Sequence, residues 1–203
     1  MERCDWCKSE DIYVQYHDEE WGVPVHDDQV HFEFLVLESA QSGLSWITIL
    51  KKRENYRKAY DGFDPIKVAQ YGEKKVNELL SNPGIIRNRS KIESSINNAK
   101  RFIEIQKEFG SFDRYIWSFV DHKPVVNRYE KVSEIPATSA LSDQISKDLK
   151  KRGFKFLGSI TIYSYLQAVG IVDDHINACC KKSLNYQHLQ SLEDWTKENA
   201  NMK

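Results

Sequence analysis

The chain has 203 residues, of which 40% are hydrophobic, and it carries 29 basic against 30 acidic residues for a net charge of −1. This length suits one compact domain with a full core, and the composition excludes a disordered chain or a membrane span of roughly 20 apolar residues. The charge balance excludes nucleic-acid binding through bulk charge but permits a locally basic face. The charged first residues do not resemble a secretion signal, so we expect a cytoplasmic protein.

Capping residues mark the ends of four expected helices. Aspartate and serine favour the position before a helix, proline favours its first turn, and glycine favours its end. On these signals we expect helices from Asp27 or Asp28 to about Ser42, from Asp64-Pro65 onward, from about Asn88 to Gly110, and from near Ser139 to Gly153.

Apolar residues recur at helical spacing in most of the chain, and period-two alternation is scarce. The β-branched run 159–163 could form a strand, but residues 164–172 continue it at helical spacing, so we expect a helix there. The pattern predicts an all-α fold of eight to ten helices in one domain over residues 1–180. The polar segment 181–203 is expected to be a flexible tail.

Residues 79–91 join two helical patterns through a turn of asparagine, proline and glycine. Proline ends the first helix and glycine allows a tight reversal, which leaves amide groups and basic side chains available to a phosphate. This segment resembles the helix-hairpin-helix element of DNA repair proteins, which grips the DNA backbone without reading sequence. An ordinary corner between two helices is the alternative. The candidate DNA-binding residues here are Gly84, Ile85, Arg87, Arg89 and Lys91.

Cysteine and histidine residues lie near both ends of the chain. Four cysteines are too few for a disulfide framework, so metal binding or plain burial explains them better. On a helix, His175 and Cys179 share one face, whereas Cys180 would point about 140° away from His175. Two sulfurs and two imidazoles can close a structural zinc site, although Cys4 with Cys7 is a competing pair and burial alone is the alternative. The candidate ligands are Cys4, His17, His175 and Cys179.

Aromatic residues gather in the first quarter of the chain, at Trp6, Tyr13, Tyr16, Trp21 and Trp46. Glu38 follows an apolar helical run and shares its face with Phe34 and Leu35, so we expect a buried or pocket carboxylate that needs a partner or a role. The turn at 43–46 places Trp46 near Glu38. A carboxylate beside stacking rings is typical of a base pocket, while core packing is the alternative.

With these residues in view, the sequence resembles the bacterial 3-methyladenine DNA glycosylase I family of the helix-hairpin-helix superfamily. The resemblance runs from Met1 to about Cys180. It is carried by the blocks Tyr13–Pro24, Leu37-Glu38, Ser42–Arg53, Gly84–Arg87, Trp117–Val120 and Leu149–Gly158.

The resemblance implies a helix-hairpin-helix glycosylase fold whose two ends are joined by one structural zinc ion. It implies a monofunctional enzyme that flips 3-methyladenine out of alkylated double-stranded DNA, hydrolyses its N-glycosidic bond, and releases the free base, leaving an abasic site. We expect a monomer with no membrane partner. The implied catalytic residue is Glu38, and the implied base-binding residues are Tyr13, Tyr16, Trp46 and Trp6. Leu44, after Gly43, matches a residue that enters the gap left by the flipped nucleotide.

Two other functions are compatible with the same residues. One is a non-catalytic helix-hairpin-helix DNA-binding module, in which Glu38 is only a buried structural acid. The other is a helical zinc protein that binds another protein, in which basic clusters such as Lys147 to Lys155 are solvated faces. Release of a free methylated base separates the enzyme from both.

Overall fold

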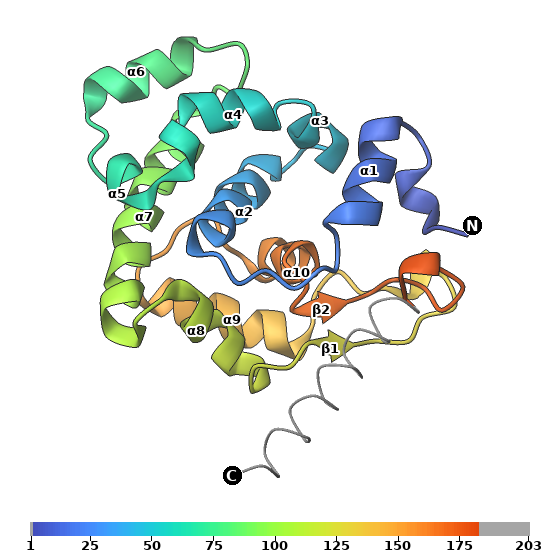
Figure 1. Ribbon diagram of the computed structural model, residues 1–203. Helices are drawn as coiled ribbons and strands as arrows, with labels where there is room; N and C mark the ends of the chain where they lie inside the picture. Colours follow the sequence, from blue (N-terminus) through green and yellow to red (C-terminus); the bar gives the residue numbers. More distant parts are fainter. Residues whose placement is uncertain (1, 183–203) are drawn as a thin grey trace, which may run out of the picture.

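Helix α2 (Asp28–Gln41) runs through the middle of the computed structural model, which describes residues 2–182 (Figure 1). Every residue from His31 to Ala40 is buried, as suits a helix that is apolar on nearly all sides. The helix begins where it was predicted, because the Asp27 carboxylate accepts the Val30 amide at 3.0 Å. Its neighbours are α3 (Trp46–Leu50), α7 (Arg89–Phe109), α8 (Phe112–Trp117) and α10 (Ser159–Ala168).

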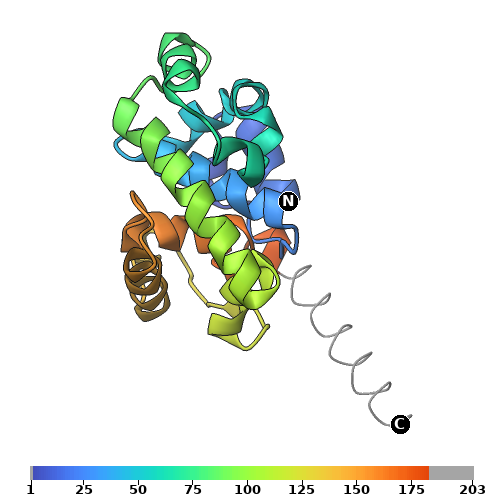
Figure 2. The same ribbon diagram turned by 90° about the vertical axis from the view of Figure 1, so that its left-hand side faces the viewer.

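The described residues hold ten α-helices, within the predicted range, together with four short 3-10 helices, which are labelled η. Helix α7 crosses the front of the molecule diagonally in the view of Figure 2. The remaining helical elements are η1 (Asp5–Cys7), α1 (Asp11–Glu19), α4 (Arg53–Ala59), η2 (Asp61–Phe63), α5 (Pro65–Val68), α6 (Glu73–Ser81), η3 (Ser118–Val120), η4 (Val132–Glu134) and α9 (Ala140–Lys151).

The other predicted helix boundaries are also confirmed. Asp64 caps α5, and Asn88 caps α7 by accepting the Lys91 amide at 3.1 Å. Helix α7 ends at Gly110, whose φ of 87° lies in the left-handed region that favours glycine. Ser139 caps α9. No helix of the described residues is both long and apolar enough to cross a membrane.

The prediction of helix through Val172 is wrong at its end. Helix α10 stops at Ala168, and β2 (Val172–Asp173) pairs in parallel with β1 (Val125–Val126). The chain turns at Gly170, which has a φ of 67° and lies so close to the backbone of Val23 that an added Cβ would fall 2.2 Å from the Val23 carbonyl carbon. A tertiary contact therefore decides where this helix ends.

The two ends of the described chain lie side by side. The Cys180 amide donates to the Glu2 carbonyl at 2.9 Å, which places residues 175–182 against the N-terminal segment. Residues 180–182 are helical, and the rest of the predicted tail, 183–203, lies outside the described residues.

Candidate active site and metal site

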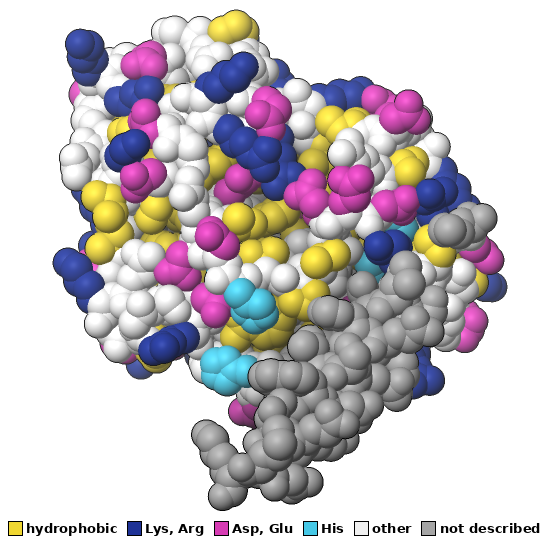
Figure 3. Space-filling model, viewed as in Figure 1, with side chains coloured by type: hydrophobic (Ala, Val, Ile, Leu, Met, Phe, Trp, Pro, Cys, Tyr) yellow, Lys and Arg dark blue, Asp and Glu magenta, His cyan; other side chains and the backbone are white. Residues whose placement is uncertain are grey.

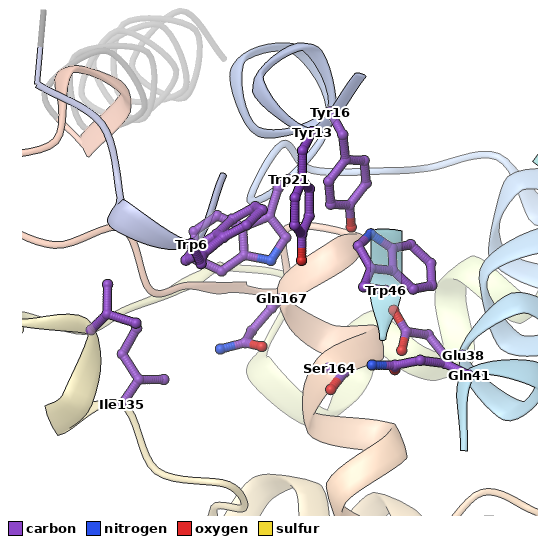
Figure 4. A pocket seen from close by; sticks show the side chains of 11 residues that line it. Trp6, Tyr13, Tyr16, Trp21, Glu38, Gln41, Trp46, Ile135, Ser164 and Gln167 are labelled. Atoms are coloured by element: carbon purple, nitrogen blue, oxygen red, sulfur yellow. The ribbon is translucent and has the colours of Figure 1, made fainter. Parts of the chain in front are cut away.

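A cavity of about 300 Å³ opens between α1, α2, α3 and α10, where pairs of residues three apart on one helix face point into the same space. Tyr13 and Tyr16 come from α1, and the tyrosine hydroxyls point toward the centre of the cavity (Figure 4). The residues that line it are Trp6, Tyr13, Tyr16, Trp21, Glu38, Gln41, Trp46, Val132, Ile135, Ser164 and Gln167.

The ring side chains of this cavity support one another. Trp6 meets Tyr13 edge to face at 4.9 Å between ring centroids and meets Trp21 at 5.0 Å. On the other side of the cavity, the ring centroids of Trp46 and Tyr16 are 5.5 Å apart. Such contacts fix ring orientation, so the cavity presents preformed aromatic surfaces. Trp6, Tyr13, Tyr16 and Trp46, which the sequence analysis predicts to bind the base, thus line the same cavity as Glu38.

Glu38 is buried at 4% exposure, and its Oε2 atom has no hydrogen-bond partner. Burial raises the pKa of this carboxyl to about 8. The indole Nε1 of Trp46 is also buried and unpartnered. A buried polar atom without a partner is costly, so an acceptor and a donor left unpaired beside one cavity indicate a ligand that hydrogen-bonds to both.

The two tyrosines keep their protons throughout the neutral range. Burial raises the pKa of Tyr16 well above its ordinary value, and the nearby Glu38 adds to the shift. Burial likewise raises the pKa of Tyr13. Both hydroxyls therefore act as neutral groups that can donate or accept a hydrogen bond.

We expect Glu38→Gln to stabilise the fold increasingly as pH rises. The pKa of Glu38 is about 8 in the folded protein against an ordinary value of 4.5, so between these pH values the folded state holds a proton that the unfolded state has released. Folding stability is thus lost as pH rises through this window, by up to a few kcal/mol, whereas glutamine never ionises. Urea unfolding at about pH 5 and about pH 9 measures the difference. The exposed Glu19→Gln is the control, and an equal gain at both pH values would contradict the expectation.

Sequence reasoning missed several residues of the cavity. Gln41 lies one turn after Glu38, and Ser164 and Gln167 lie one turn apart on α10, so helical spacing from Glu38 could have found only the first of them. Val132 and Ile135 come from the segment around η4, and no local pattern marks them.

The predicted metal ligands from the two ends of the chain also meet. One ligand atom each from Cys4, His17 and Cys179 lies within 4.8 Å of the others, and all three residues are buried. His175 lies beside this group, with its ring centroid 4.9 Å from that of His17. Cys7 is outside the group and directs its Sγ to the Cys4 carbonyl at 3.1 Å.

Carboxylates hold one nitrogen of each histidine ring. Nδ1 of His17 contacts Asp18 at 2.8 Å, and Nδ1 of His175 contacts Asp173 at 2.9 Å. Nε2 of His175 is buried without a partner, and Nε2 of His17 lies 3.4 Å from the Cys179 sulfur. This arrangement, with Nδ1 bound to a carboxylate and Nε2 left for a ligand, is typical of metal-binding histidines.

Cys179 has the electrostatic surroundings of a thiolate. Hydrogen bonds from Cys4 and then from His17 lower the pKa of the Cys179 thiol, against the opposing effect of burial, while the same contact between the two sulfurs raises the pKa of the Cys4 thiol. A thiolate is the form that binds a metal. The expected helical placement of His175 and Cys179 is wrong, because residues 174–179 form a turn after β2, in which the Cys179 amide donates to the Ile176 carbonyl at 2.8 Å.

The backbone amides of the hairpin differ from those of the predicted phosphate site, because they already have acceptors within the protein. The Gly84 amide donates to the Asn82 side chain at 2.8 Å, and the Ile86 amide donates to the Tyr56 hydroxyl at 3.1 Å. Ile85 is buried, as predicted, and its amide donates to the Asn82 carbonyl at 3.4 Å. The expectation of free amides at Gly84 and its neighbours is therefore wrong, because Asn82 accepts two of them and Tyr56 of α4 accepts the third.

The three basic side chains of the hairpin have different surroundings. Arg89 forms ion pairs with Glu73 at 2.9 Å and Glu93 at 3.1 Å. Lys91 donates to the carbonyls of Ala40 at 2.9 Å and Ser42 at 2.7 Å, which fixes the turn that carries Gly43 and Leu44. Arg87 is exposed.

Leu44 follows this turn with 41% of its surface exposed. Its amide donates to the carbonyl of Gln41, a residue that lines the cavity. The side chain therefore lies within about one helical turn of the cavity wall. On the face drawn in Figure 3, basic and acidic side chains are interspersed and do not form a single basic field.

Known proteins are similar to this chain in both sequence and fold. The family described as Methyladenine glycosylase matches residues 6–182. DNA-3-methyladenine glycosylase 1 of Escherichia coli (strain K12) is 49% identical over 180 residues, which are 89% of this chain and 96% of that protein. A crystal structure of 3-methyladenine DNA glycosylase I superposes with a TM-score of 0.86 at 47% identity, covering 88% of this chain and 98% of the other.

A third similar protein is described by the base that it recognises. The structure that describes 3-methyladenine recognition by 3-methyladenine DNA glycosylase I from Staphylococcus aureus has a TM-score of 0.86 at 40% identity, over 89% of this chain and 96% of that one. Matches of this extent leave little of the described chain outside the shared fold. This chain therefore belongs to the methyladenine glycosylase family.

Proposed function

We propose that this protein excises 3-methyladenine from alkylated DNA by hydrolysing the N-glycosidic bond, which leaves an abasic site. The observation that carries the proposal is the unpartnered carboxyl of Glu38, buried among aromatic rings in a cavity of about 300 Å³. A space of this size suits one nucleobase, and the family relatives are named for this activity. The protein is expected to act as a monomer in the cytoplasm.

The cavity selects a base that has left the duplex. Excision requires the nucleotide to flip out of the stack, at a cost of a few kcal/mol that is smaller for a damaged base. Trp46 and Tyr16 present ring surfaces on which the flipped base stacks, and the Trp46 indole N–H is available to donate to it. Stacking accepts any purine, so a further feature must supply the preference for the lesion.

Charge supplies that preference. Methylation at N3 makes the adenine of the nucleotide cationic, and a cation beside Glu38 lowers the pKa of the carboxyl from about 8, so the bound group becomes a carboxylate. The carboxylate then stabilises the lesion and the oxocarbenium-like transition state, from which the base departs neutral. An unmodified purine lacks this charge and leaves the buried carboxyl protonated.

Water completes the reaction and the DNA strand stays intact. Lysine is absent from the cavity lining within residues 2–182, so no amine is placed to form a Schiff base with the sugar. This arrangement supports a monofunctional glycosylase.

The direct test is chromatography of the supernatant after incubation with alkylated DNA. Free 3-methyladenine is expected, with unbroken strands until the abasic sites are treated with alkali. Absence of free base together with retained DNA binding would instead support a non-catalytic DNA-binding module. Absence of both would support a zinc protein with another partner.

We propose that Cys4, His17, His175 and Cys179 bind one structural zinc ion. The donor set fits this ion because two thiols and two imidazoles complete a tetrahedral site with no open position. The orphaned Nε2 of His175 and the carboxylates behind both rings support the fit. Bound zinc would tie the N-terminal segment that carries Trp6 to the chain after β2, and so support one wall of the base pocket.

We further propose that the hairpin contacts the DNA backbone through Arg87. Its guanidinium is exposed, whereas Arg89 and Lys91 have protein partners. We expect Arg87→Ala to reduce the slope of log Kd for the duplex against log salt concentration by up to about one, the value for one lost phosphate contact. Titrations of a duplex at several salt concentrations measure this slope.

The affinity for free 3-methyladenine should survive in Arg87→Ala, because the cavity is built from other segments. Lys67→Ala, on α5, is the control for loss of one exposed charge. Equal damage to base binding and duplex binding would mean that the hairpin supports the pocket wall or the whole fold.

A further inference from the structure

Two large apolar side chains are exposed where the chain enters α10. Phe156 is 45% exposed and Ile160 is 63% exposed. Phe156 has a φ of 59°, a left-handed conformation that bulky residues rarely adopt. An exposed aromatic ring in a strained backbone gains the fold little, and such outliers cluster at functional positions.

The strained loop is firmly anchored on both sides of Phe156. Asn98, which is 3% exposed, donates to the Lys155 carbonyl and accepts the Lys155 amide, both at 2.8 Å. On the other side, the Leu157 carbonyl accepts the Ser146 hydroxyl at 2.8 Å, and Leu157 is buried. These bonds hold the Phe156 ring outward in a fixed position, as a contact surface requires.

The Phe156 loop and the Leu44 turn are anchored to the same helix. Lys91 binds the turn before Leu44, and Asn98 binds the loop before Phe156. These two residues are seven apart on α7, so they lie on one face of the helix, roughly 10 Å apart along its axis. Figure 2 shows the loop before α10 alongside α7. The distance along the helix axis between these two anchoring residues equals about three base-pair steps of a duplex.

Ile160 extends the same surface to the mouth of the base pocket. It lies four and seven residues before Ser164 and Gln167, which line the cavity, so the three share one face of α10. Leu44 lies three residues after Gln41, in the turn that follows α2. The exposed apolar residues thus flank the cavity, one group on the α2 side and the other on the α10 side.

We propose that Phe156 and Ile160 form a second DNA-contacting edge, which packs against the bases of the undamaged strand while Leu44 packs beside the flipped nucleotide. The assignment rests on the proposed glycosylase function, in which the cavity and Leu44 engage the damaged strand. Charge agrees with DNA as the occupant, because Lys155 is exposed next to Phe156 and Lys150 and Lys151 are exposed at the end of α9.

The test compares binding to double-stranded and single-stranded oligonucleotides that carry a tetrahydrofuran abasic analogue. The variants are Phe156→Asn, because asparagine tolerates the left-handed backbone, and Ile160→Ala. Ile66→Ala is the matched control, because Ile66 is 59% exposed on α5, which does not line the cavity. Thermal unfolding and free 3-methyladenine binding are measured on every variant.

For Phe156→Asn we expect the Kd for the duplex to rise at least about fivefold, the lower end for loss of one contact between a base and an aromatic ring. Ile160→Ala should raise it by less. The Kd for the single strand, the melting temperature and the affinity for free base should stay at wild-type values, and Ile66→Ala should match the wild type throughout.

Three outcomes would overturn the inference: wild-type duplex binding by Phe156→Asn, an equal loss on the single strand, or a change of oligomeric state in place of a change in duplex affinity. Loss of free-base affinity or of thermal stability would overturn it too, because the ring would then serve the pocket or the core. The abasic analogue contains no base to release, so this test is independent of the glycosylase assay. A wild-type protein that releases no methylated base would refute the proposed function separately.

Discussion

Replacing Glu38 with glutamine is expected to reduce excision of 3-methyladenine by about 10²- to 10³-fold, the usual loss when one preorganised electrostatic contact to a transition state is removed. Glutamine keeps the size and shape of the side chain but cannot balance a cationic base. Among the described residues that line the cavity, Glu38 is the only acidic one, so no other carboxylate there can take over its charge. Single-turnover release of free base from a methylated duplex measures the effect.

The pH dependence of the wild-type enzyme should report the same carboxyl. With the pKa of Glu38 at about 8 in the free protein, the fraction of carboxylate rises with pH, so kcat/KM should increase up to about pH 8 and then level off. The residual activity of Glu38→Gln should lack this rise. Glu19→Gln, at an exposed position of α1, should keep both the rate and the profile of the wild type.

A near-wild-type rate for Glu38→Gln would make Glu38 a structural acid and contradict the mechanism. The stability of the Glu38→Gln variant then becomes informative, because its expected gain in unfolding free energy at high pH depends only on burial of the wild-type carboxyl. A variant that is more stable at high pH and yet fully active would therefore show that the buried charge is dispensable for catalysis.

The second large effect is expected from the proposed zinc site. Elemental analysis should find about one zinc ion per chain, and Cys179→Ala or His175→Ala should lose it. Because the ligands join the two ends of the described chain, loss of the ion should lower the unfolding free energy by several kcal/mol and the melting temperature by on the order of 10 °C. Metal analysis paired with thermal unfolding measures both.

Two other cysteines serve as controls for the zinc site. Cys180 is adjacent to Cys179 in sequence, and Cys7 is as fully buried as Cys4, yet neither belongs to the group whose ligand atoms meet. Cys180→Ala and Cys7→Ala should therefore keep the metal. Loss of zinc from either variant to the same degree as from Cys179→Ala would contradict the ligand assignment.

Local sequence signals predicted the helical framework well. Capping aspartate, asparagine and serine residues, together with Gly110, mark real helix ends, because a cap satisfies orphan backbone groups within a few residues of chain. The same holds for Glu38, whose burial follows from its position on an apolar helix face. The turn at 43–46 placed Trp46 near Glu38, and the resemblance to the glycosylase family then implied base-binding roles for Tyr13, Tyr16 and Trp6.

Long-range contacts decided the features that the sequence analysis predicted incorrectly. Helix α10 ends early because Gly170 lies against the backbone of Val23. His175 and Cys179 approach one another on a turn, because β2 pairs with β1 and ends the regular structure before them. Neither partner segment is adjacent in sequence, so no periodicity reveals it.

Basic residues show the difference between sequence and tertiary structure most clearly. In the sequence, Lys91 belongs to the hairpin segment, Lys155 to the cluster 147–155, and Arg53 follows two lysines, so the three look alike. In the folded protein Lys91 holds the turn before Leu44, Arg53 is buried in ion pairs with Glu20 and Glu33, and Lys155 is exposed beside Phe156. The sequence alone determined most of the helical framework, the buried acid and the residue types of both sites. The tertiary structure decided which charges remain available to DNA, because a charge is neutralised by whichever partner the fold brings within hydrogen-bond distance.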